Sequence, residues 1–118
     1  MKQANTSSFS DFYRDAYWAE HKVPINLAMH MLGTIAGVLL VVASLTFISP
    51  WWALAFPIVH VAPGLIGHRI FERTEAVGDA RIFRTDVPGW WFIAANHLMT
   101  ARMIGYFVTL RWLRKSLQ

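Results

Sequence analysis

Five histidines stand in or beside apolar segments of this 118-residue chain. His30 follows Asn26 by four residues and precedes Gly33 by three, so all three share one face of a helix. A second stripe repeats every four residues and consists of His60, Gly64, His68 and Glu72. A polar side chain in hydrocarbon is costly unless it has a partner, so both stripes indicate a buried functional site.

The residue types in these stripes are typical of a transition-metal site. Imidazoles with one carboxylate suit iron, zinc or copper, whereas magnesium and calcium prefer oxygen ligands. Glu72 either completes the ligand set or orients His68 through a hydrogen bond. Asn26, one turn before His30, holds a ligand or a substrate carboxylate. The chain contains no Cys, which excludes disulfides and thiolate sites.

The composition indicates that these residues lie in a membrane. Apolar residues make up 55% of the chain and charged residues 15%, where a soluble domain has roughly 25% charged residues. So few charges cannot cover a small globule in water, and lipid is the obvious apolar solvent. We expect an all-α fold, a small integral membrane helical bundle, formed by residues 1–118 as one domain with residues 1–8 loose.

Hydropathy divides the chain into an amphipathic helix and apolar runs. Residues 25–48 carry no charge, and about 20 residues suffice to cross a bilayer. A break at Ser49-Pro50 separates them from a second run, 51–67, which continues in water to residue 75, so the two form a transmembrane hairpin. The last run, 90–110, is either one span or two shorter helices. A helix from Ser10 or Asp11 to Glu20 either lies on the membrane or packs on the fold.

The hairpin would bring His30 of the first stripe and His68 and Glu72 of the second to one depth. His30 and His68 lie at its same end, and His21 stands just before Pro24 at that level. We therefore expect a metal site from three different elements. A single histidine at a membrane interface is more often a hydrogen-bonded or snorkelling residue than a ligand, and this alternative applies to each one taken alone.

The other singled-out residues have two interpretations each. His60 lies deeper and has a structural or proton-handling role. His97 is either a fourth ligand or a packing residue. The glycines of the hairpin are most simply positions where helices approach closely. These are Gly33, Gly37, Gly64 and Gly67.

The net charge of +4 comes from Lys and Arg residues that flank apolar segments. This arrangement favours anionic lipid headgroups over a nucleic acid partner. The N-terminal segment and the loop after the second run are basic, whereas the Ser49-Pro50 turn is not. The positive-inside rule therefore places the N-terminus and the central loop in the cytoplasm, at the inner membrane of a bacterium or the endoplasmic reticulum of a eukaryote.

Two motifs resemble one membrane family. Residues 21–33 contain His21, Pro24, Asn26, His30 and Gly33 in the spacing H-x-x-P-x-N-x-x-x-H-x-x-G. Residues 67–72 read G-H-R-I-F-E and resemble that family's G-H-x-x-F-E signature. The family is that of the yeast 2-hydroxy fatty acid dioxygenase, and the resemblance extends from about Phe9 to Arg102.

The resemblance implies an iron(II)-dependent dioxygenase that takes a 2-hydroxy fatty acid and oxygen and releases a fatty acid one carbon shorter, as in α-oxidation. His21, His30 and His68 match the family's histidines and would hold the iron, although the ligand types alone also accept zinc. Asn26 and Glu72 match its other polar positions.

Two basic residues and one difference from the family's sequence pattern concern the substrate. Arg69 and Arg73 are expected to steady the substrate carboxylate. Many relatives have E-x-x-x-P-A after the signature, whereas residues 72–77 here read E-R-T-E-A-V, which bears on the substrate class.

Two alternatives to the enzyme remain at this point. One is a non-catalytic metal-binding or structural membrane protein. The other is a small transporter or scaffold that oligomerises through its glycine faces.

Overall fold

The computed structural model describes residues 7–71 and 87–116, and the part of the chain that it describes is helical without a strand. The elements are α1 (Phe9–Asp11), η1 (Phe12–Tyr17), α2 (Trp18–Glu20), α3 (Pro24–Thr46), η2 (Pro50–Ala55), α4 (Phe56–Phe71) and α5 (Trp90–Ser116). The expected all-α fold is confirmed. The first three elements form one continuous helical segment whose middle, η1, is a π-helical turn.

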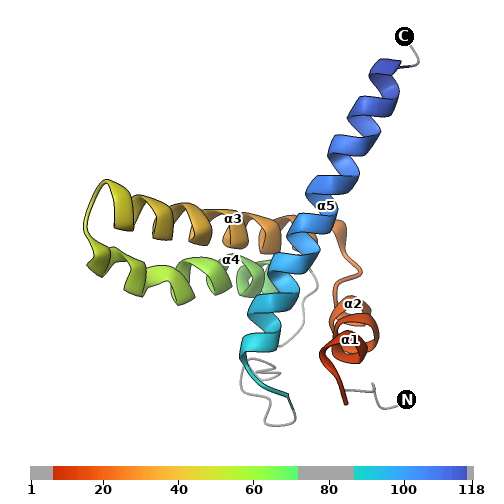
Figure 1. The fold of residues 1–118 in the computed structure, drawn as a ribbon. Coiled ribbons are helices and arrows are strands. Elements are labelled where there is room, and N and C mark those ends of the chain that lie inside the picture. Colours follow the sequence, from red (N-terminus) through yellow and green to blue (C-terminus); the bar gives the residue numbers. More distant parts are fainter. Residues whose placement is uncertain (1–6, 72–86, 117–118) are drawn as a thin grey trace.

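Helix α3 and the segment η2–α4 form the expected hairpin, with the two arms side by side (Figure 1). Pro24 opens α3, where its missing N–H leaves no hydrogen bond unmade. Both arms are long and apolar enough to cross a membrane. Their outer faces expose large aliphatic side chains such as Leu39 and Ile58, at 62% and 72%. Lipid accommodates such faces, which supports a membrane protein.

Glycines set how closely the two arms approach. A Cβ atom at Gly33 would overlap the main-chain carbonyl of His60, and one at Gly37 would lie 3.0 Å from the ring of Phe56. The expected close packing at these glycines is therefore confirmed, and it occurs within the chain. A scaffold that oligomerises through Gly33 and Gly37 would need these faces outside, whereas both residues are buried in the hairpin.

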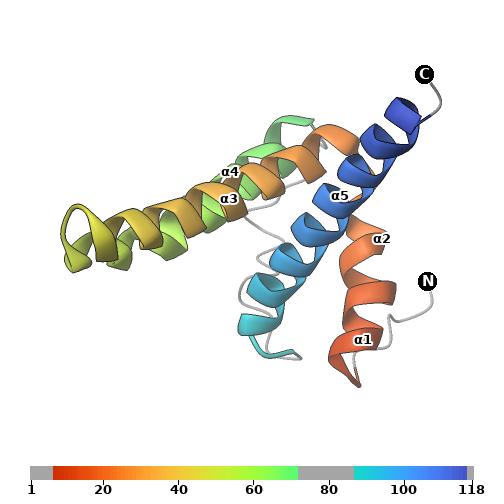
Figure 2. The ribbon, with the colours of Figure 1, turned by 45° about the horizontal axis from the view of Figure 1, so that its top comes forward.

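Helix α5 crosses the hairpin near the end where α3 begins, and its C-terminal half extends beyond the other helices (Figures 1 and 2). It is a single helix from Trp90 to Ser116, which excludes two shorter helices. Among the helices that the structure describes, only the two hairpin arms are long and apolar enough to span a membrane.

The N-terminal segment packs its aromatic face on the first half of α5. Phe12 and Tyr17 are each 1% exposed, and the ring of Phe12 meets that of Phe92 at a centroid distance of 5.0 Å. Ala95 and Met99 of α5 are fully buried in the same cluster. The amphipathic helix is thus confirmed, and its apolar face contacts protein. This core holds α5 and the N-terminal segment against the end of the hairpin.

Candidate metal centre

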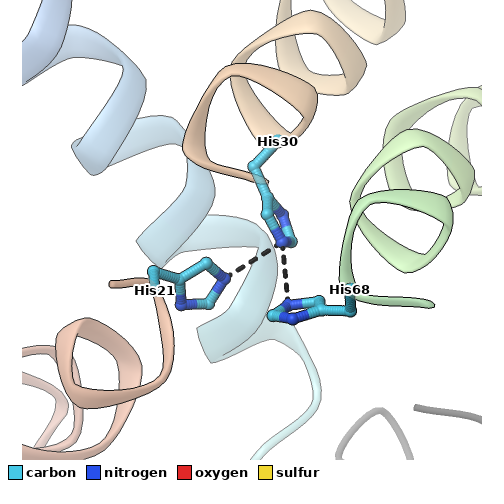
Figure 3. A group of neighbouring side chains, drawn as sticks. All are labelled: His21, His30 and His68. Carbon is cyan, nitrogen blue, oxygen red and sulfur yellow. Dashed lines mark hydrogen bonds between the residues drawn. The ribbon is translucent and has the colours of Figure 1, made fainter. Parts of the chain in front are cut away.

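Three elements each present one imidazole to a common point (Figure 3). His21 lies in the link between α2 and α3, His30 in the second turn of α3, and His68 in the last turn of α4. The link exists because Pro24 disfavours a helical conformation at Val23, whose φ and ψ are −89° and 116°. One ring nitrogen from each histidine lies within 4.8 Å of the others. The three histidines can hold a metal ion.

The orientation of His21 is fixed by Tyr17. His21 Nδ1 lies 2.6 Å from the main-chain oxygen of Tyr17. A carbonyl only accepts, so Nδ1 carries the proton and donates, which leaves Nε2 with a lone pair. This Nε2 lies 3.0 Å from His30 Nε2. The Tyr17 ring also stacks on the imidazole, with centroids 4.1 Å apart and planes at 22°.

The imidazole of His30 lies in the space left by Gly64, which has no side chain. A Cβ atom at Gly64, on the facing helix α4, would overlap this imidazole. Asn96 of α5 forms a hydrogen bond with the same ring. The Tyr17 hydroxyl donates to Asn96 Oδ1. Burial raises the pKa of Tyr17, so this hydroxyl stays protonated and able to donate.

His68 is held by Asn26, which is fully buried in the first turn of α3. The Asn26 amide nitrogen lies 2.9 Å from His68 Nδ1 and 3.2 Å from His68 Nε2. Gly67 leaves room for this amide, because a Cβ atom there would overlap Asn26 Oδ1. His68 Nε2 lies 3.2 Å from His30 Nε2. The structure thus brings Asn26 and His68 together.

Hydrogen bonds among the rings cannot satisfy both contacts of His30 Nε2. A neutral imidazole nitrogen either donates or accepts. If His30 Nε2 accepts a hydrogen bond from His68, it carries no proton that it could donate to the lone pair of His21 Nε2. If it donates to His21, it cannot accept from His68. Two nitrogens bound to one ion at about 2.1 Å each lie at most about 4.2 Å apart, and the observed 3.0 and 3.2 Å fall within this limit. The residues present therefore fit a bound transition metal.

The remaining expected site residues lie elsewhere. Arg69, next to His68, is exposed at the same end of the hairpin. His97 stacks on His60, with centroids 5.1 Å apart and planes at 12°, and is not among the three converging histidines. Its Nδ1 donates to the Ile93 carbonyl at 2.8 Å. Glu72 and Arg73 lie outside the described residues.

His60 is fully buried, and neither of its ring nitrogens has a hydrogen-bond partner among the described residues. Its main chain abuts Gly33 and its ring contacts Phe56. These contacts agree with a structural role in the hairpin, one of the two interpretations that its sequence position left open.

Sequence reasoning missed the two residues that support the histidines. In the sequence, Tyr17 is one of several aromatic residues of the amphipathic N-terminal helix, and nothing in its spacing distinguishes it from them. Asn96 stands in the uncharged stretch 90–101 of α5, where a lone amide is itself a signal of a buried contact. That signal was overlooked beside the neighbouring His97.

Comparison with known proteins gives one match. The model of a family described as Mpo1-like, "2-hydroxy-palmitic acid dioxygenase Mpo1-like", matches residues 6–107. Searches of curated proteins and of solved structures gave no match. The matched range includes all three converging histidines and both residues that support them.

Proposed function

Because this chain belongs to the Mpo1-like family, we propose that it is an Fe(II)-dependent dioxygenase that shortens 2-hydroxy fatty acids by one carbon. The observation that carries the metal site is the convergence of the three Nε2 atoms, of which that of His30 lies 3.0 Å from that of His21 and 3.2 Å from that of His68. The family's description supplies the reaction type and the substrate class. Iron is proposed over zinc because oxygen chemistry needs a redox-active metal.

The donor set supports a catalytic site better than a structural one. Among the residues that the structure describes, His21, His30 and His68 give three protein ligands, whereas structural zinc sites usually have four. When bound, iron would supply a Lewis-acid centre at which substrate and oxygen can be held side by side. The chain's own part is to orient the three imidazoles through Tyr17, Asn96 and Asn26.

The hairpin suits a substrate with one polar end. A 2-hydroxy acid has its hydroxyl and carboxylate together, and these would lie at the histidine end, near Arg69. Arg73, outside the described residues, is proposed for the same role. The alkyl chain would follow the lipid-exposed faces of the arms toward an apolar hollow lined by Val38, Val41, Val42 and Phe56. Val42 lies roughly 18 Å beyond His30 along α3, comparable to the alkyl chain of a long fatty acid.

Charge supports a cytoplasmic location of the histidine end. Arg14, Lys22 and Arg69 are exposed near this end, whereas the connection at Ser49-Pro50 carries no charge. By the positive-inside rule the N-terminus would face the cytoplasm, at the bacterial inner membrane or the endoplasmic reticulum.

Oxygen uptake tests the proposed reaction. A 2-hydroxy acid plus one molecule of oxygen balances to the shortened acid, carbon dioxide and water, so no other reductant is required. Purified protein loaded anaerobically with Fe(II) should consume oxygen with 2-hydroxypalmitate and form pentadecanoate in equal amount, measured with an oxygen electrode and mass spectrometry. Palmitate, which lacks the hydroxyl, is the control and should give neither. Stoichiometric iron without oxygen uptake would favour the non-catalytic metal-binding alternative.

Asn26 should affect metal binding through the tautomer of His68. A metal needs the lone pair of His68 Nε2, so Nδ1 must carry the proton and find an acceptor. A half-turn of the Asn26 amide presents its oxygen to Nδ1, and an aspartate there would accept equally. We expect Asn26→Leu to lower Fe(II) affinity about tenfold and Asn26→Asp to retain it, measured by competition with a chromophoric chelator. An unchanged affinity in Asn26→Leu would contradict this role.

A further inference from the structure

Tyr17 contacts the metal centre through its main chain and its ring. Its carbonyl accepts the proton of His21 Nδ1, and its ring lies 4.1 Å from the His21 imidazole, centroid to centroid. The residue is itself 1% exposed within the core between the N-terminal segment and α5. Because this core fixes Tyr17, it also fixes the direction of the His21 lone pair.

A third contact extends from Tyr17 to a second ligand. The hydroxyl donates to Asn96 Oδ1, and Asn96 hydrogen-bonds His30. Asn96 is 6% exposed, so water competes little for these bonds, and buried hydrogen bonds of this kind hold their partners strongly. One side chain of the N-terminal segment is thereby linked to two of the three imidazoles.

The backbone around Tyr17 is unusual in a way that agrees with such a role. Phe12–Tyr17 is a π-helical turn. Such turns are rare and occur frequently at functional sites. Here the turn ends at Tyr17, the residue that touches the centre.

We propose that Tyr17 and Asn96 are a positioning pair that orients His21 and His30 and thereby sets the metal affinity of the centre. This inference rests on the proposed metal site. Neither residue binds the metal. The pair acts because it holds two imidazoles, from the α2–α3 link and from α3, in one mutual orientation before a metal arrives.

Tyr13 provides a matched control from the same segment. It is 5% exposed, and its ring stacks on that of Tyr17 with centroids 5.6 Å apart. Its hydroxyl has no hydrogen-bond partner among the described residues. Tyr13→Phe therefore removes the same atom as Tyr17→Phe from the same core without breaking the link to Asn96.

The experiment compares Tyr17→Phe, Tyr13→Phe, Asn96→Leu and the double variant Tyr17→Phe/Asn96→Leu in the full chain in detergent. Fe(II) affinity is measured by chelator competition, and the geometry of the site by the visible absorption of the Co(II)-loaded protein. Tyr17→Phe should weaken Fe(II) binding about tenfold and change the Co(II) spectrum. Tyr13→Phe should do neither. The double variant should bind no more weakly than Asn96→Leu alone, because both changes break one link.

Several outcomes would overturn the inference. If Tyr17→Phe binds Fe(II) like the wild type, the hydroxyl link from Tyr17 to Asn96 does not set the metal affinity and the inference fails, while the metal centre and the proposed function stand. If Tyr13→Phe loses as much affinity as Tyr17→Phe, core packing accounts for the loss. If the wild type holds no Fe(II), the inference and the proposed function fall together. Thermal unfolding of each metal-free variant checks folding, and Asn96→Leu carries the test if Tyr17→Phe does not fold.

Discussion

Replacement of His30 by alanine is expected to reduce bound iron to background and to abolish oxygen uptake. His30 Nε2 is the central atom of the cluster, 3.0 Å from His21 Nε2 and 3.2 Å from His68 Nε2. Its loss leaves only two of the three converging imidazoles. Alanine is the strongest helix former, so α3 should persist and the effect should be on the site. Metal content per chain after anaerobic Fe(II) loading measures the result.

The other histidines refine this test. His21→Ala and His68→Ala should also lose stoichiometric iron, because each supplies one of the three converging nitrogens. His97→Gln is the matched control, since its ring lies against His60 and outside the cluster. Iron retained by His30→Ala would show that His30 is not a ligand. Iron lost from His97→Gln would instead support the fourth-ligand interpretation of His97.

The helices of the hairpin could be predicted because their signals are local. An uncharged run, a Ser49-Pro50 break and a second apolar run fix two antiparallel arms, and the number of residues from each end then sets the depth of His30 and His68. The depth of His21 followed from Pro24, which must end the preceding helix. Three histidines on three elements could thus be assigned to one level from spacing alone.

The contacts that hold these histidines in place could not be predicted in the same way. Tyr17 meets Asn96 because α5 crosses the end of the hairpin and because η1 is π-helical, and neither feature has a local signal. Asn96 and His97 are adjacent, so their side chains differ in direction by about 100° on α5. Only the crossing of α5 decides that the amide, and not the imidazole, reaches His30.

The amphipathic pattern of the N-terminal helix had the same limitation. An apolar face built from Phe12, Tyr13 and Tyr17 fits a bilayer surface and a protein surface equally well. The choice depends on the partner face of α5, where Ala95 and Met99 are fully buried against it. This packing makes the N-terminal segment part of the site, because it carries Tyr17.

Substitution of Gly64 by alanine is expected to weaken metal binding more than tenfold and to lower the stability of the hairpin. The added Cβ atom would overlap the His30 imidazole, so either the ring leaves the cluster or the arms separate. Overpacking of this kind costs about 1–3 kcal/mol, partly offset by about 1 kcal/mol from the better helix propensity of alanine. The metal loss should therefore exceed what the stability loss alone would give. Chelator competition and thermal unfolding in detergent measure the two effects.

Two other glycines make this test specific. Gly105 lies in α5 with nothing within 4 Å of an added Cβ atom, so Gly105→Ala should leave metal binding unchanged and stabilise the helix by up to about 1 kcal/mol. A Cβ atom at Gly33 would meet the His60 backbone and no ligand. Gly33→Ala should therefore destabilise the hairpin at least as much as Gly64→Ala. For the same loss of stability, it should lose less metal affinity than Gly64→Ala does. If Gly64→Ala binds Fe(II) as tightly as the wild type, the His30 ring does not occupy the space beside Gly64, and the three-histidine centre would have to be assembled differently.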